Sequence, residues 1–326
     1  MLHPELMPAA MKVVTTCLEV KAGESALVVT DSNMGEIAES FLSALHAIGN
    51  DAVLMLMSPR CHSGEEPPPH VGQAMAASDV SLLVTSKSLS HTQARLQTLA
   101  AGGRIASMPG ITQDMMTVGG LTADYYRVAK LSRAIVALLN QADSARITTA
   151  RGTDIQMSLS GRVLPKPPDD GFITRRGQFG NLPGGEAAIA PIEESVEGVL
   201  VVDGSVAPTG RVREAIAIEI RHGQIERIEG GYEAQELKQF LWRFDESARV
   251  VGELGIGTNE KARVTGNILE DEKSLGTFHL GFGTNIGMGG QINAQTHNDV
   301  VVLKPDIFLD EKQIMKAGVP VLDQGR

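Results

Sequence analysis

Short apolar runs in the first half of the chain, separated by segments of helical periodicity, constrain the fold more than any other feature. The run at residues 26–30 (ALVVT) is continuous, as expected of a strand buried on both faces. Residues 35–48 are amphipathic and end at Gly49-Asn50, a helix-stop signal. Further strands are predicted at 52–57, 80–85 and 104–107, and further helices at 5–18 and 92–101. This rhythm predicts βαβ units in a doubly wound parallel sheet.

The character of the chain changes near Asp143. A long helix at 123–141 is expected to close the first domain, and the second half is predicted to be mostly β. Two strands flank Arg151-Gly152, a hairpin turns at His222-Gly223, and residues 232–246 form the one clear helix. The predicted organisation is therefore an α/β scaffold domain (1–142) followed by a mostly β (α+β) metal-binding catalytic domain (143–326).

Composition excludes several classes of function. The net charge of −10 argues against nucleic acid as a partner, because phosphate binding requires a basic surface. No apolar run approaches a membrane span, and the first residues do not form a signal peptide, so a cytoplasmic protein is expected. The loop DSNMGE after the first strand has one glycine and no dinucleotide-binding pattern.

A glycine-rich stretch from Gly252 to Asp299 holds the strongest candidate site. If the segment around His297 and Asp299 is extended, these residues project to the same face, because residues two apart in a strand share a face. Imidazole and carboxylate together suit Zn, Co, Mn or Fe(II). The alternative is a buried histidine that is bonded to its neighbouring aspartate.

The other candidates each have a structural alternative. His279 alone is more typical of a core histidine, Glu253 of a paired or an exposed strand residue, and Glu186 of a lone acid in a Gly/Pro-rich loop. The charge run Glu270-Asp271-Glu272 is interpreted as a solvated turn, and His222 as a turn residue.

Three residues could contact a substrate. His91 follows a predicted strand, at the end where open α/β sheets bind ligands, although a helix-start residue fits equally well. Arg175 and Arg176 precede Glu186 in the loop and could neutralise a substrate carboxylate, but exposed arginines would look the same.

Four motifs, NLPGGEAAIAP, GELGIGTN, FHLGFG and THNDVV, resemble in order and spacing those of the aminopeptidase T family of metallo-aminopeptidases. The resemblance covers the C-terminal half well and the N-terminal half loosely. It implies two divalent metal ions held by two Glu, two His, an Asp and a Tyr. No Tyr follows His279, and Ile286 stands seven residues on. The other five positions are filled by Glu186, Glu253, His279, His297 and Asp299.

The resemblance implies a homodimeric hydrolase that releases N-terminal residues from small peptides. A metal-activated water would attack, and Glu186 or Glu253 would act as the general base. One or two Zn, Co or Mn ions are the expected cofactors.

The chain also resembles the 2,5-dihydroxypyridine dioxygenases in length, in layout and in its closing H-x-D pair. That resemblance implies one Fe(II) held by His279, His297 and Asp299, with open positions for dioxygen and a small-molecule substrate. The carboxylates at 186 and 253 favour a second metal and hydrolysis, so the hydrolase is ranked first. A non-catalytic relative is the third hypothesis.

Overall fold

The computed structural model describes residues 3–322 and divides the chain into two compact units. The first comprises Met1–Tyr126 with Gly171–Gly184, and the second comprises Arg127–Asp170 with Gly185–Arg326. This division differs from the boundary predicted between residues 142 and 143. Helix α6 (Tyr125–Leu139) belongs almost entirely to the second unit, because its residues Ile135, Val136 and Leu139 pack in that unit's core.

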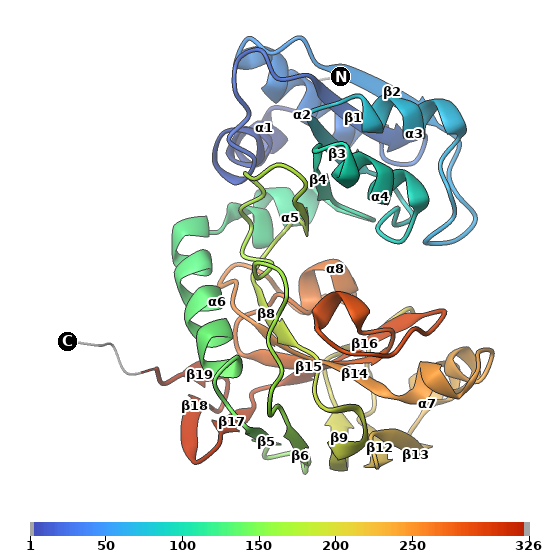
Figure 1. Cartoon of the computed structure of the whole chain (residues 1–326), viewed down its shortest axis with the longest axis vertical. Coiled ribbons are helices and arrows are strands. Elements are labelled where there is room, and N and C mark those ends of the chain that lie inside the picture. The colour runs from blue at the N-terminus through green and yellow to red at the C-terminus, as the bar shows by residue number, and fades with distance from the viewer. Residues whose placement is uncertain (1–2, 323–326) are drawn as a thin grey trace. The chain divides into compact units, whose positions relative to one another are not determined.

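The first unit contains a five-stranded parallel sheet with the order β2-β1-β3-β4-β7. Strands β1 to β4 of this sheet are labelled in Figure 1. The sequence did not predict β7, which returns from the loop-rich segment to pair with β4. The strands are β1 (Ala26–Asp31), β2 (Val53–Met57), β3 (Val80–Val84), β4 (Arg104–Ser107) and β7 (Phe179–Asn181).

Helices connect the parallel strands. The chain steps from β1 outward to β2 and then back across β1 to β3, so right-handed crossovers place the connecting helices on opposite faces. Helix α1 packs with α2, and α3 packs with α4. The doubly wound α/β class is therefore confirmed. The helices are α1 (Met7–Lys12), which continues as a π-helix (Val13–Cys17), α2 (Gly35–Ala47), α3 (Pro69–Ala76), α4 (Gln93–Ala100) and α5 (Gln113–Thr117).

The second unit is built on two sheets, and the neighbouring strands described in both pair antiparallel. The eight-stranded sheet, in the order β13-β12-β9-β6-β5-β17-β18-β19, consists of β5 (Ser144–Thr148), β6 (Asp154–Ser158), β9 (Glu197–Val202), β12 (Ile216–Arg221), β13 (Gln224–Glu229), β17 (Asp306–Leu309), β18 (Lys312–Lys316) and β19 (Val319–Pro320). The six-stranded sheet, in the order β11-β10-β16-β15-β14-β8, consists of β8 (Glu186–Ile189), β10 (Ser205–Val206), β11 (Gly210–Arg211), β14 (Val251–Gly257), β15 (Thr277–Gly283) and β16 (His297–Leu303).

One hydrophobic core joins the two sheets of the second unit with α6 and α7 (Tyr232–Leu241). Ile147 and Ile218 come from the eight-stranded sheet, while Leu254 and Phe278 come from the six-stranded sheet. The predicted hairpin is confirmed as β12–β13, and its turn residue His222 has a left-handed backbone (φ 48°).

A short helix and several tight turns complete the described chain. The helix is α8 (Ile268–Asp271), and the 3-10 turns are Pro4–Leu6, Gly120–Thr122, Glu193–Ser195, Glu246–Arg249 and Ile286–Met288. Within residues 3–322, no helix has both the length and the apolar character needed to span a membrane.

Candidate metal centre

One face of the six-stranded sheet carries all the predicted ligands. Side chains alternate between the two faces of a strand, so the register of paired strands decides which residues meet. Each candidate lies opposite a glycine of the neighbouring strand. The pairs are Glu186 with Gly257, Glu253 with Gly281, His279 with Gly255, Asp299 with Gly281 across the other edge, and His297 with Gly283.

The apolar residues on the opposite face of the same strands explain why the candidate ligands all point to one side of the sheet. Leu254, Leu280, Phe282 and Val300 alternate with the candidate ligands and lie in the hydrophobic core. Burial of that apolar face fixes the orientation of each strand, because a slip of one residue would exchange the two faces. The acids and imidazoles are therefore brought together by the packing of their apolar neighbours.

Two glycines make room for the imidazole rings. A Cβ atom on Gly255 would lie 2.1 Å from Cε1 and Nε2 of His279. A Cβ atom on Gly281 would lie 2.5 Å from Nε2 of His297 and 2.9 Å from Oδ1 of Asp299. These distances are far inside van der Waals contact, so the glycine-rich character of the stretch is required by the rings above it.

The five side chains form a continuous line of close contacts. Nε2 of His279 lies 2.8 Å from Oε1 of Glu186 and 3.9 Å from Oε1 of Glu253. Nε2 of His297 lies 2.7 Å from Oε2 of Glu253 and 3.1 Å from Oδ1 of Asp299. Glu186, Glu253 and His279 are buried, and the other two are partly buried.

The orientation of the rings fits a shared cation. Nδ1 of His297 donates to the carbonyl oxygen of Thr284 at 2.8 Å, so in the neutral ring the lone pair of Nε2 faces carboxylate oxygens. Neither ring nitrogen of His279 makes a hydrogen bond of acceptable geometry, although its side chain is 1% exposed. Lone pairs that face one another in a buried site require a proton or a metal ion between them. This donor set therefore fits a divalent metal.

Three overlapping groups have ligand atoms within 4.8 Å of one another. They are Glu186-Glu253-His279, Glu253-His297-Asp299 and Glu272-His279-Asp299. Each combines one imidazole with two carboxylates. Among the described residues, no such group contains both histidines, so the expected set of His279, His297 and Asp299 is not one compact triad.

Lys273 and Glu272 join the cluster, and sequence reasoning did not select them. Nζ of Lys273 is buried, donates to Oε2 of Glu186, lies 2.6 Å from Oε1 of Glu272 and lies 3.6 Å from Oδ2 of Asp169. The buried ammonium neutralises part of the charge of these carboxylates.

The interpretation of Glu270-Asp271-Glu272 as a solvated turn was wrong. Glu270 and Asp271 are fully buried, and Asp271 accepts hydrogen bonds from the backbone of Thr265 at 2.7 Å and Gly266 at 2.9 Å. A charge run is usually solvated, but here helix α8 turns it inward. The available signal was its position just before the strand that carries His279.

The cluster shifts the pKa values of its members. Burial disfavours the imidazolium of His279, but the Glu186, Glu253 and Asp299 carboxylates outweigh burial and raise its pKa to about 9. Burial raises the pKa of Glu272 to about 8; Lys273 opposes this, and the Asp299 carboxylate reinforces it. The site thus holds strong negative potential that favours bound cations.

The remaining predicted residues lie elsewhere. His91, Arg175 and Arg176 are exposed and belong to the first unit, so their expected roles toward a substrate stay predictions. His222 is an exposed turn residue, as predicted.

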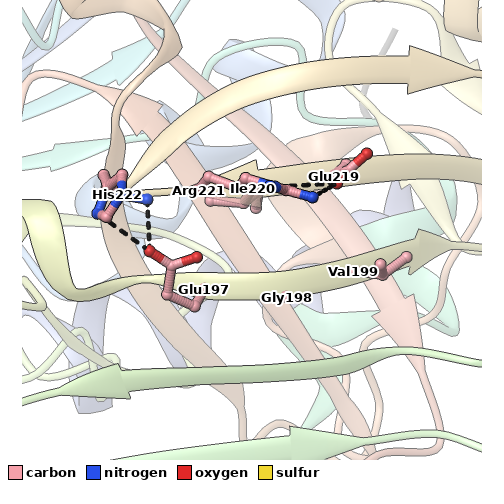
Figure 2. A pocket seen from close by; sticks show the side chains of 7 residues that line it. All are labelled: Glu197, Gly198, Val199, Glu219, Ile220, Arg221 and His222. Carbon is pink, nitrogen blue, oxygen red and sulfur yellow. Dashed lines mark hydrogen bonds and ion pairs between the residues drawn. The ribbon is translucent and has the colours of Figure 1, made fainter.

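A surface pocket of about 510 Å³ in the second unit is formed by β9 and β12 (Figure 2). Its charged groups satisfy one another: the backbone N–H of His222 donates to Oε1 of Glu197 at 2.7 Å, and Nη2 of Arg221 donates to Oε1 of Glu219 at 2.7 Å. None of its lining residues belongs to the acid–imidazole cluster. The cluster therefore remains the candidate site.

The fold and the site together define a two-unit α/β protein with a buried acid–imidazole centre. A family model described as 2,5-dihydroxypyridine 5,6-dioxygenase matches residues 5–322. The chain therefore belongs to this family. A curated relative of the same description from Pseudomonas putida KT2440 is 29% identical over 259 residues, which is 76% of this chain and 72% of the relative.

Two solved structures have the same fold. The 2,5-dihydroxypyridine dioxygenase of Pseudomonas putida KT2440 matches with a TM-score of 0.80 and 22% identity, covering 98% of this chain and 97% of that one. Wild-type AmpT from Thermus thermophilus matches with a TM-score of 0.70 and 15% identity, covering 98% and 99%. At these identities the likeness concerns the fold.

The assignment to hydrolases and aminopeptidases was wrong, because the family model and the curated relative both name a dioxygenase. The motifs shared with aminopeptidase T reflect a common fold, as the AmpT structure shows. The extra carboxylates at 186 and 253 led sequence reasoning to rank hydrolysis first. In the structure, part of their charge is taken up by Lys273 and His279.

Proposed function

We propose that this chain is an Fe(II)-dependent dioxygenase that opens the ring of 2,5-dihydroxypyridine or of a closely related hydroxylated N-heteroaromatic ring. The family membership and the name of the curated relative support the reaction class. The observation that carries the proposal is the contact of imidazole Nε2 atoms with carboxylate oxygens that require a cation between them.

Glu253, His297 and Asp299 would hold the metal ion. They form one of the three compact groups, and His297 and Asp299 are the more accessible members of the cluster. One imidazole and two carboxylates suit Fe(II) or Mn(II) better than a softer ion. When bound, Fe(II) supplies a place where a hydroxylated ring and dioxygen can be held together and exchange electrons.

The protein's own residues prepare this position. The carbonyl of Thr284 keeps the proton of His297 on Nδ1, which leaves Nε2 available as a ligand. Lys273 holds Glu186, which is the carboxylate beside His279. Glu272 lies 2.6 Å from Nζ of Lys273, and burial raises its pKa, so its carboxyl group adds little negative charge beside the metal position.

Oxygen uptake with metal reconstitution tests the proposal. Protein stripped with a chelator and reloaded anaerobically with Fe(II) should bind iron and consume oxygen when 2,5-dihydroxypyridine is added. His297→Ala should lower iron affinity by more than about 100-fold, because it removes a ligand. His222→Ala is the matched control, since its side chain is 88% exposed in the same unit. Oxygen uptake that needs no added metal, or that survives His297→Ala, would contradict the proposal.

A further inference from the structure

The loop at 284–296, between β15 and β16, carries the group that orients His297. Thr284 directly follows β15, and its carbonyl accepts the Nδ1 proton of His297 at 2.8 Å. The backbone N–H of Thr284 donates to the carbonyl of Thr296 at 2.9 Å, which closes the loop at its base. The direction of the His297 ring therefore depends on the position of Thr284.

Asn285 organises this loop from inside. Its side chain is fully buried, and its Oδ1 atom accepts from the backbone N–H of Ile292 at 2.7 Å. Its Nδ2 atom donates to Oε1 of Glu193 at 3.2 Å. The backbone carbonyl of Asn285 also accepts from the N–H groups of Met288 at 2.9 Å and Gly290 at 3.1 Å. The side-chain amide of Asn285 thus acts as a donor to Glu193 and as an acceptor from Ile292.

An ion pair holds Asn285 from the other side. Glu193 also accepts from the backbone N–H of Gln291 at 2.8 Å and pairs with the guanidinium of Arg162. Nη1 of Arg162 donates to the carbonyl of Gly289 at 2.6 Å. Glu193 and Arg162 therefore fix the loop at Asn285, Gly289 and Gln291, three points that lie close to one another along the chain.

We propose that Asn285 is a positioning residue for the metal centre, held in place by Glu193 and Arg162. It fixes the peptide that begins at Thr284, and the Thr284 carbonyl in turn keeps the ring of His297 turned toward Glu253 and Asp299. Groups that orient a ligating histidine in this way set its tautomer and raise metal affinity. The inference rests on the metal centre of the proposed function, and it adds a residue that does not contact the ion.

The variant that separates this role from simple packing is Asn285→Asp. It keeps the shape and the acceptor oxygen, but it removes the Nδ2 donor and places a carboxylate against Glu193. Asn293→Asp is the matched control, because it makes the same change at an exposed position of the same loop. Affinity for Mn²⁺, measured by titration calorimetry, should fall about 10- to 100-fold in Asn285→Asp and stay unchanged in Asn293→Asp.

The second measurement needs no metal. Long-range ¹H–¹⁵N NMR of the histidine rings should show a hydrogen-bonded Nδ1 proton on His297 in the wild type, and this signal should weaken in Asn285→Asp. Adding Glu193→Gln to Asn285→Asp should restore part of the affinity, since the amide introduced at position 193 can donate to the new carboxylate. If Asn285→Asp does not fold, Glu193→Gln alone should show a smaller loss of the same kind.

The outcomes distinguish the two proposals. Wild-type protein that binds no divalent metal would contradict the proposed function, whereas the ring signals would still test Asn285. Unchanged ring signals and unchanged Mn²⁺ affinity in folded Asn285→Asp would overturn the positioning role. Loss of thermal stability alone, with normal metal affinity, would also overturn it.

Discussion

In the first unit, β1 and β3 are buried along their whole length, and most of the side chains they contain are apolar. In the second unit, β14 and β15 are also buried throughout, yet on one face β14 carries Glu253 beside glycines and β15 carries His279 beside glycines. Both pairs of strands are equally inaccessible to water. What differs is the kind of group that each strand removes from water.

The buried acids of the two units also have different partners. Asp31, at the end of β1, accepts from the backbone N–H of Ser86 at 2.6 Å, its hydroxyl at 2.8 Å and the N–H of Asn33 at 3.0 Å. Neutral donors satisfy this carboxylate within the fold. Glu253 instead faces two imidazoles. A buried carboxylate satisfied by local N–H and O–H groups is structural, whereas one that meets only other ionisable groups marks a site for a cation.

Removing the buried ammonium group of Lys273 should have the largest effect on stability. Lys273→Met leaves the carboxylate of Glu186 without its buried ammonium partner, and such a loss costs about 3–5 kcal/mol. Urea unfolding in the presence of a chelator should show this loss. Lys261→Met, at an exposed position of the same unit, should change stability by less than about 0.5 kcal/mol. Equal effects of the two variants would show that Lys273 does not carry the charge balance.

Filling the space above a site glycine should have a smaller effect on stability but a clear effect on metal binding. Gly255→Ala places a methyl group 2.1 Å from the ring of His279, and such overpacking costs about 1–3 kcal/mol. Iron content per chain should fall with it. Gly35→Ala, where nothing lies within 4 Å, should leave the iron content unchanged and stabilise slightly. Normal iron content in Gly255→Ala would break the link between the glycine pattern and the site.

The scaffold could be predicted where local pattern and burial agree. The strand at 26–30 and the helix at 35–48 correspond closely to β1 and α2, because each pattern repeats with the period of its element. Strand β7 and the discontinuous unit boundary could not be predicted. Both depend on a loop-rich segment that pairs with β4, whose residues lie 74 positions earlier in the chain.

The site was predictable to the extent that it follows strand alternation. His297 and Asp299 were paired correctly on one face, and the structure brings Glu186, Glu253 and His279 to the same row. Lys273 was missed because a lysine within a charge run normally lies in solvent. The ligand types alone could not decide between a hydrolase and a dioxygenase, because carboxylates and imidazoles serve both chemistries.

The smallest expected effect concerns an ion pair of the first unit that is independent of the metal centre. Glu24 accepts from both Nη atoms of Arg104, at 2.6 and 2.8 Å, and this hydrogen-bonded pair lowers the pKa of Glu24 below 4.5. A lowered pKa stabilises the folded state above the unfolded value and loses that contribution as the pH falls through the folded value.

Glu24→Gln should therefore cost about 1 kcal/mol at pH 7, because the carboxylate is partly exposed and Gln keeps an acceptor for Arg104. The difference from wild type should shrink as the pH drops below 4.5, where the wild-type carboxyl group also becomes neutral. Urea unfolding at a series of pH values measures it, with the exposed Glu39→Gln as control. Iron content should be unaffected. An iron loss in Glu24→Gln would show that the buried charges of the two units are not independent, which would remove the contrast between a structural and a functional carboxylate.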